Sequence, residues 1–189
     1  MDRREAVTKV AWLLGGTVLG ANLFVDMSCK PKAKKFNNEF DVDQVAFLDE
    51  VADTILPTTS TPGAKAAKVG AFMALMVQDC YTPEDQKVFE KGIKELDNAS
   101  DKKFSKKFVE LDPKQKTELL VQLDKEQKDY QSKKKPEEAN HYFRMMKELT
   151  LLGYFTSEIG CTQALRYSAV PGRYDGCMPY KKGDKAWAT

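Results

Sequence analysis

Five side chains of the sequence have the chemistry needed for acid–base or nucleophilic catalysis: His141, Glu148, Glu158, Asp175 and Cys177. Such groups catalyse only when they converge on one pocket within hydrogen-bonding reach of a substrate, and no short spacing brings these five together. His141 is the only histidine and stands at the start of an expected helix, which is typical of a structural residue. The sequence therefore predicts no catalytic residue, and a stand-alone enzyme using these groups is an alternative.

The motifs that bind common redox cofactors and metals are absent from the sequence. It has no G-x-G-x-x-G turn, no P-loop and no C-x-x-C pair. A single histidine is too few for bis-histidine haem ligation or a histidine-rich zinc site. We therefore expect neither a cofactor nor a metal in this chain. With 30 Lys+Arg against 28 Asp+Glu, the net charge is only +2, which argues against a nucleic-acid partner held by its phosphates.

Residues 1–29 are typical of an export signal that could also serve as an anchor. Arg3 and Arg4 precede an apolar run from Val10 to Val25, whose helical length of about 24 Å is short of a bilayer core of about 30 Å. Paired arginines before a mildly apolar segment predict export through the Tat translocase, which carries folded proteins. A general secretory leader is the alternative.

The end of this leader leaves its processing open. Ser28-Cys29 resembles the end of a lipobox, so Cys29 is a candidate for lipidation. The leader could be cleaved, retained or lipidated at Cys29. These three outcomes would give a free protein, a protein anchored by its N-terminal segment, or a protein anchored by a lipid. We expect a periplasmic protein, either free or anchored to the membrane through the N-terminal segment or through Cys29.

Behind the leader, helix signals recur and strand signals are nearly absent. We predict an all-α fold: a compact bundle of about five to seven helices over residues 39–166, with an N-terminal signal helix, a basic linker over 30–38 and an extended C-terminal arm over 167–189. Helix starts are expected where a capping residue, a proline or a turn precedes an apolar stripe. These starts are Asp41, Ala64, Thr82, Asp112 and Pro136.

Three further expectations concern the faces and the ends of these helices. The helix over 64–80 would place Phe72, Leu75 and Met76 on about one face. The cationic stretch 125–135 is expected to be a frayed helix end and a loop. The longest apolar helix is expected to start at Pro136 and to run past Leu152.

Residues 167–189 differ in character from the helices. Aromatic side chains are spread among prolines and glycines with no helical or strand period: Tyr167, Tyr174, Tyr180 and Trp187. Disordered tails are poor in aromatic residues, whereas Tyr and Trp are favoured at interfaces. We expect an extended arm that lies on a surface, which is either the chain's own helices or another subunit.

The cysteines also bear on whether the arm contacts the chain's own helices or another subunit. If Cys29 is lipidated or removed, Cys80, Cys161 and Cys177 remain, and three thiols cannot all pair within the chain. The odd one is either buried or bonded to a partner. A Cys161–Cys177 disulfide would join the arm to the last helix, but it requires a Cα separation that the sequence does not specify.

Several blocks of the sequence resemble a known family. They are the Arg3-Arg4 leader, Val51–Pro57 followed by Thr61–Ala64, Glu148–Glu158, and Pro171–Cys177. In these blocks the chain is similar to the gluconate 2-dehydrogenase subunit 3 family. Between Glu84 and Lys135 only the helical pattern matches.

The resemblance implies a small, cofactor-free and non-catalytic subunit of a periplasmic or membrane-associated dehydrogenase. Its partner would be a large FAD-containing subunit of the GMC type that oxidises a sugar or sugar acid, with a cytochrome c as the usual electron acceptor. The small subunit would stabilise the large one and carry it through the Tat pathway. A helical envelope lipoprotein that acts as a scaffold, without a dehydrogenase, is the alternative.

The expected contact surface for such a partner combines the end of the last helix with the arm. It comprises Tyr154, Phe155, Thr156, Ser157, Pro171, Gly172, Arg173, Tyr174, Asp175 and Gly176.

Overall fold

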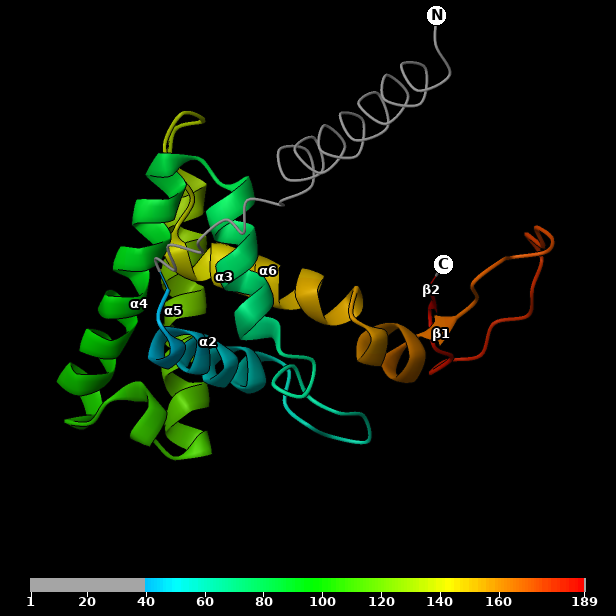
Figure 1. The fold of residues 1–189 in the computed structure, drawn as a ribbon, viewed down its shortest axis with the longest axis horizontal. Helices are drawn as coiled ribbons and strands as arrows, with labels where there is room; N and C mark the ends of the chain where they lie inside the picture. The colour runs from blue at the N-terminus through cyan, green and yellow to red at the C-terminus, as the bar shows by residue number, and fades with distance from the viewer. Residues whose placement is uncertain (1–39, 189) are drawn as a thin grey trace, which may run out of the picture. The chain divides into compact units, whose positions relative to one another are not determined.

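The computed structural model describes residues 40–188, and within them the chain is almost entirely helical (Figure 1). Five α-helices follow one another: α2 (Val42–Ile55), α3 (Val69–Cys80), α4 (Pro83–Phe104), α5 (Pro113–Lys133) and α6 (Tyr142–Phe155). A 3₁₀ turn, η1 (Phe108–Glu110), precedes α5, and a π-helical turn, η2 (Gly160–Ala164), follows α6. The predicted helical bundle is confirmed. The leader and linker, with Arg3, Arg4 and Cys29, lie outside the described residues.

Local capping explains where three of the helices begin. Asp41 accepts a 2.7 Å hydrogen bond from the Gln44 N–H, and the Gln44 side chain accepts one from the Asp41 N–H, forming a capping box for α2. The Thr82 hydroxyl caps α4 by accepting a 3.2 Å hydrogen bond from the Asp85 N–H, with a proline at the first helical position. Asp112 forms a capping box for α5. These three predicted starts are confirmed.

Helix α3 differs from the prediction in both its start and its buried face. The segment from Ala64 forms turns, and the helix begins at Val69 after Lys68, whose φ of 54° is left-handed. The buried face contains Val69, Met73 and Val77, while Leu75 is exposed. The reason is close packing on α2, because a Cβ at Gly70 would lie 2.5 Å from the Val45 carbonyl oxygen.

The connection between α5 and α6 also differs from the prediction. Residues 125–133 are helical and belong to α5, with Gln127 buried, instead of forming a frayed end. Helix α6 starts at Tyr142, after the turn that contains Pro136, and Leu152 on its last turn is exposed. Its apolar residues lie on more than one face, so the position of each depends on which neighbours the helix meets.

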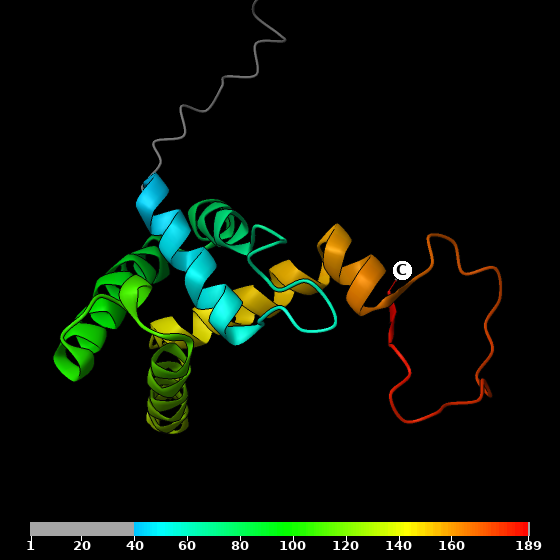
Figure 2. The ribbon, with the colours of Figure 1, turned by 90° about the horizontal axis from the view of Figure 1, so that it is seen from below.

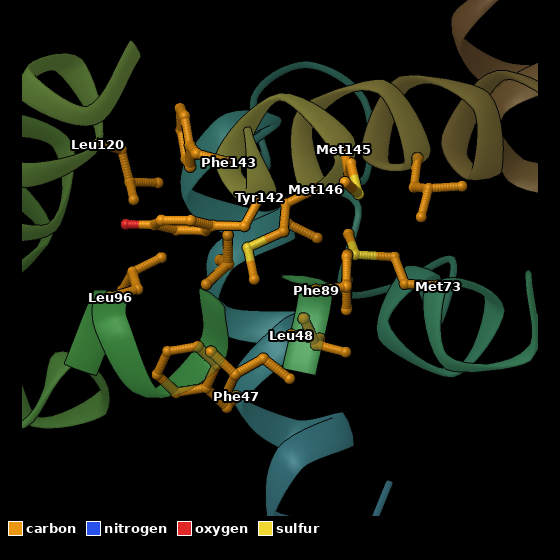
Figure 3. Close-up of a cluster of buried hydrophobic side chains, with 14 of the residues drawn as sticks. Phe47, Leu48, Met73, Phe89, Leu96, Leu120, Tyr142, Phe143, Met145 and Met146 are labelled. Carbon is orange, nitrogen blue, oxygen red and sulfur yellow. The ribbon is translucent and has the colours of Figure 1, made fainter. Parts of the chain in front are cut away.

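The core forms around α6, which contacts each of the other four helices. Figure 3 shows the side chains of α2, α3, α4 and α5 converging on Tyr142, Met145 and Met146. Gly92 allows α4 to approach α6 closely, because a Cβ there would lie 2.3 Å from the Tyr142 side chain. The helical body therefore has a closed apolar core of its own, and α6 leaves it towards the C-terminal residues.

Candidate partner-binding site

The arm is a closed loop, not an open extension. Strand β1 (Arg166–Tyr167) pairs in parallel with β2 (Trp187–Ala188), which joins the two ends of the loop. The Arg166 guanidinium lies 4.6 Å from the centre of the Trp187 ring, a cation–π contact that supports this pairing. In Figures 1 and 2 the loop, coloured orange to red, stands clear of α2, α3, α4 and α5.

The end of α6 positions the base of the arm. The Tyr154 hydroxyl donates a 2.7 Å hydrogen bond to the Pro62 carbonyl, which ties the loop after α2 to α6. The Ser157 hydroxyl donates to the Tyr154 carbonyl and accepts from the Gly160 N–H. A Cβ at Gly160 would lie only 1.8 Å from the Tyr154 carbonyl oxygen. The chain can therefore turn into η2 only because residue 160 is a glycine.

The four expected contact residues at the end of α6 have different environments. Tyr154 is buried, with 4% of its surface exposed, so its role in the described structure is to hold the segment in place. Phe155 is 38% exposed. Thr156, the C-cap, is exposed, and Ser157 is partly buried. Phe155 therefore provides the apolar surface at this point, next to the exposed Leu151 and Leu152 of α6.

The six expected contact residues on the arm, 171–176, are all exposed. Tyr174 shows 96% of its surface and Tyr180 shows 76%. Pro171, Tyr174, Met178 and Trp187 line an open hollow of about 640 Å³ within the loop, together with polar neighbours. Because nearly all arm residues are exposed, the arm does not lie on the chain's own helices, which was one of the two expected locations.

The side chains considered for catalysis do not converge. His141 is the N-cap of α6, and its Nδ1 accepts a 3.2 Å hydrogen bond from the Phe143 N–H. Glu148 pairs with Arg144 at 2.8 Å, and Glu158 is exposed beyond the end of α6. His141 and Glu158 are thus separated by the whole helix, about 20 Å, while Asp175 and Cys177 lie on the arm.

His141 acts as a cap only when its imidazole is neutral, because the cap uses a nitrogen lone pair. Burial lowers the pKa of His141 below its usual 6.5 and so favours that neutral form. The residue therefore has a structural role in the described chain, as the sequence indicated. Across residues 40–188 no three His, Cys, Asp or Glu side chains lie close enough to hold a metal ion, and no helix in this range is long and apolar enough to cross a membrane.

The three described cysteines are free thiols. Cys80 and Cys177 are exposed, whereas Cys161 lies in η2 with its Sγ 3.1 Å from the Phe155 carbonyl oxygen. No disulfide therefore joins the arm to the last helix in this structure, and closure depends on β1 and β2.

Sequence reasoning missed two features of this site. Leu152 was expected to contribute to an apolar helix, and its exposure next to Phe155 was not foreseen. The pairing of Arg166 with Trp187 joins residues 21 positions apart, and two-residue strands have no period to detect. The single Trp in an otherwise cationic C-terminal segment was the one feature of the sequence that could have indicated this pairing.

Comparison with protein-family models matches residues 42–172 to the gluconate 2-dehydrogenase subunit 3 model. The chain belongs to this family. As a member of the gluconate 2-dehydrogenase subunit 3 family, it is implied to be a subunit of a sugar-acid dehydrogenase complex. The matched range covers all five described helices, η2, β1 and the first residues of the arm, and ends at Gly172. Searches of the curated proteins and of the solved structures gave no match.

Proposed function

We propose that this chain is the non-catalytic small subunit of a periplasmic or membrane-associated dehydrogenase that oxidises a sugar or sugar acid. Its partner is a large FAD-containing subunit of the GMC type, which carries the chemistry and passes electrons to an acceptor such as a cytochrome c. Membership in the subunit 3 family supports the partnership. The separation of His141, Glu158 and Cys177 supports a non-catalytic role.

The exposed arm is the observation that carries this proposal. Tyr and Trp side chains combine a large apolar surface with a polar tip and are enriched at protein interfaces. In this arm, Tyr167, Tyr174, Tyr180 and Trp187 are each at least half exposed. With Phe155 at the end of α6, they are exposed apolar side chains, and the π-helical turn η2 connects the arm to the folded body. A surface of this kind is favoured at a binding site for another protein.

Export of the pair is the second part of the proposal. The body buries its own core around α6, so this chain is able to fold before it meets a translocase. Arg3 and Arg4 would direct the folded chain to the Tat pathway, and a large subunit bound through the arm would be carried with it. The partner then needs no leader of its own.

Co-purification from the envelope fraction tests the partnership. The tagged chain should retain a stoichiometric protein with the absorbance spectrum of bound flavin, and the purified complex should oxidise a sugar or sugar acid with an artificial electron acceptor. Purification of the chain alone, with periplasmic dehydrogenase activity unchanged after deletion of its gene, would refute the proposal. Fatty-acid labelling of Cys29 without a flavoprotein would favour the scaffold lipoprotein.

Replacement of Arg3 and Arg4 by lysine tests the export route. Both subunits should then accumulate in the cytoplasm, because lysine keeps the charge but disrupts the twin-arginine signal. The matched control replaces Arg144 of α6 by lysine, which makes the same type of change at a residue outside both the leader and the arm. Normal export of the partner with the altered leader would count against the Tat route while leaving the partnership intact.

A further inference from the structure

The sheet that closes the arm is unusually small for a parallel sheet. Strands β1 and β2 pair over two residues each, with Arg166 opposite Trp187 and Tyr167 opposite Ala188. Parallel sheets normally occur with both faces covered, and an isolated two-stranded sheet is at best marginally stable. Across the described residues this sheet has only these two strands. Its geometry is therefore that of an incomplete sheet.

Two contacts hold this incomplete sheet in place before any partner binds. Arg166 stacks on the Trp187 ring, and the Lys185 ammonium donates a hydrogen bond to the Gln163 carbonyl of η2. Tyr167 and Trp187 nevertheless remain 52% exposed each. The strands are therefore pre-arranged without being covered, which reduces the entropy cost of adding a further strand.

The hydrogen-bond pattern shows which backbone groups are free to accept that strand. The N–H groups of Arg166 and Ser168 donate to the carbonyls of Ala186 and Ala188, each at 2.8 Å. Backbone groups alternate in direction along a strand, so the N–H and C=O of Tyr167 point to the opposite edge of β1. An edge of this kind is a template for a strand from another chain.

We propose that the Tyr167 edge of β1 binds an extended edge strand of the FAD-containing large subunit, which completes the sheet by strand addition. This inference rests on the proposed function, because it names the way in which that partner docks. Residues 166–188 contain five basic and two acidic side chains. The partner strand is therefore expected to be flanked by acidic residues, which would orient it on the cationic arm.

Comparison of two substitutions at one position separates backbone pairing from side-chain contact. Tyr167→Pro removes the outward N–H and the ring, whereas Tyr167→Ala removes the ring alone. In the purified complex, the Pro variant should bind the large subunit about tenfold or more weakly than the Ala variant, because a buried hydrogen bond is lost. Both variants should unfold at the same temperature when free, because β1 lies outside the helical core.

Amide hydrogen exchange in the unaltered chain gives an independent measurement. Exchange at the Tyr167 amide should slow on complex formation, while Gly183, which is not among the expected contact residues and has no neighbour within 4 Å of its Cβ position, serves as a reference on the same arm. Equal affinities of the Pro and Ala variants, or unchanged exchange at Tyr167 in the complex, would overturn strand addition while the partnership stands. If the unaltered chain holds no flavoprotein, the proposed function itself fails.

Discussion

The helical body and the arm use aromatic side chains in opposite ways. In the body, Phe89 (0% exposed) and Phe143 (2% exposed) are both buried in the same core (Figure 3). In the arm, Tyr174 is 96% exposed and has no core to join. Burial of a large apolar side chain stabilises a fold by about 1.5–3 kcal/mol, so the body gains from its aromatic residues and the arm gains nothing. The difference supports the proposal that the body supplies stability and the arm supplies a binding surface.

The largest effect is expected from a substitution in the body. Phe89→Ala should lower the free energy of unfolding by about 3–5 kcal/mol, because it leaves a cavity in the core. Chemical denaturation of the free chain measures this change. The matched substitution Tyr174→Ala on the arm should leave the unfolding midpoint unchanged, and a comparable loss there would show that the arm belongs to the fold.

The junction between the two regions is tested by a pair of glycines. Gly160→Ala should cost about 1–3 kcal/mol of stability or displace η2, because its Cβ would overlap the Tyr154 carbonyl. Gly172→Ala is the control, because no atom lies within 4 Å of the Cβ it would add. Thermal unfolding is measured for both variants, and partner affinity only for Gly160→Ala, because Gly172 is itself an expected contact residue. Equal unfolding temperatures of the two variants would mean that the close approach at Gly160 does not position the arm.

Binding by the arm should depend on its most exposed aromatic residue. Tyr174→Ala should weaken the complex with the large subunit by about 2 kcal/mol, the size typical of a hot spot. Titration calorimetry measures the dissociation constant, and Tyr130→Ala on α5 is the control, because Tyr130 is an exposed tyrosine outside the arm. An unchanged constant for the Tyr174 variant would exclude that residue from the contact.

The smallest effect concerns two ion pairs in the body that share the carboxylate of Asp124. Lys128 and Lys147 bond to Asp124 and lower its pKa to about 2. Because the folded pKa lies below the unfolded value of 3.8, this contribution is present at neutral pH and is lost as the pH falls through about 2. Asp124→Asn should cost about 1 kcal/mol at neutral pH. Urea unfolding of both proteins at neutral pH and below about pH 2 measures this, and the same loss at both pH values would contradict it.

Local signals explain which parts of the fold the sequence predicted correctly. The side chains of Asp41, Thr82 and Asp112 each accept a hydrogen bond from the backbone N–H three residues later. Residues close in sequence therefore determine where α2, α4 and α5 begin. The start of α3 was predicted wrongly because it depends on a distant contact. Asp49 of α2 accepts a hydrogen bond from the Gly70 N–H, which fixes the first turn of α3 from another helix.

The candidate site shows the same division between local and distant signals. The mixture of Tyr, Pro and Gly after Tyr167 predicted an aromatic segment with no regular period. In the structure, residues 168–186 form such a segment, with neither helix nor strand. The closure of that segment was not predicted, because Arg166 meets Trp187 only after the loop folds back. The exposure of Leu152 was missed for a similar reason: packing of Gly153 against Phe72 decides which side of α6 faces α3.

Removal of the arm tests most directly whether it binds the catalytic subunit. A chain that ends after Leu165 keeps all five described helices and the η2 hydrogen bond from the Leu165 N–H to the Gly160 carbonyl. We predict that it unfolds at the same temperature as the full chain and retains no flavoprotein on co-purification. Retention of the flavoprotein at full stoichiometry by this shortened chain would contradict the account.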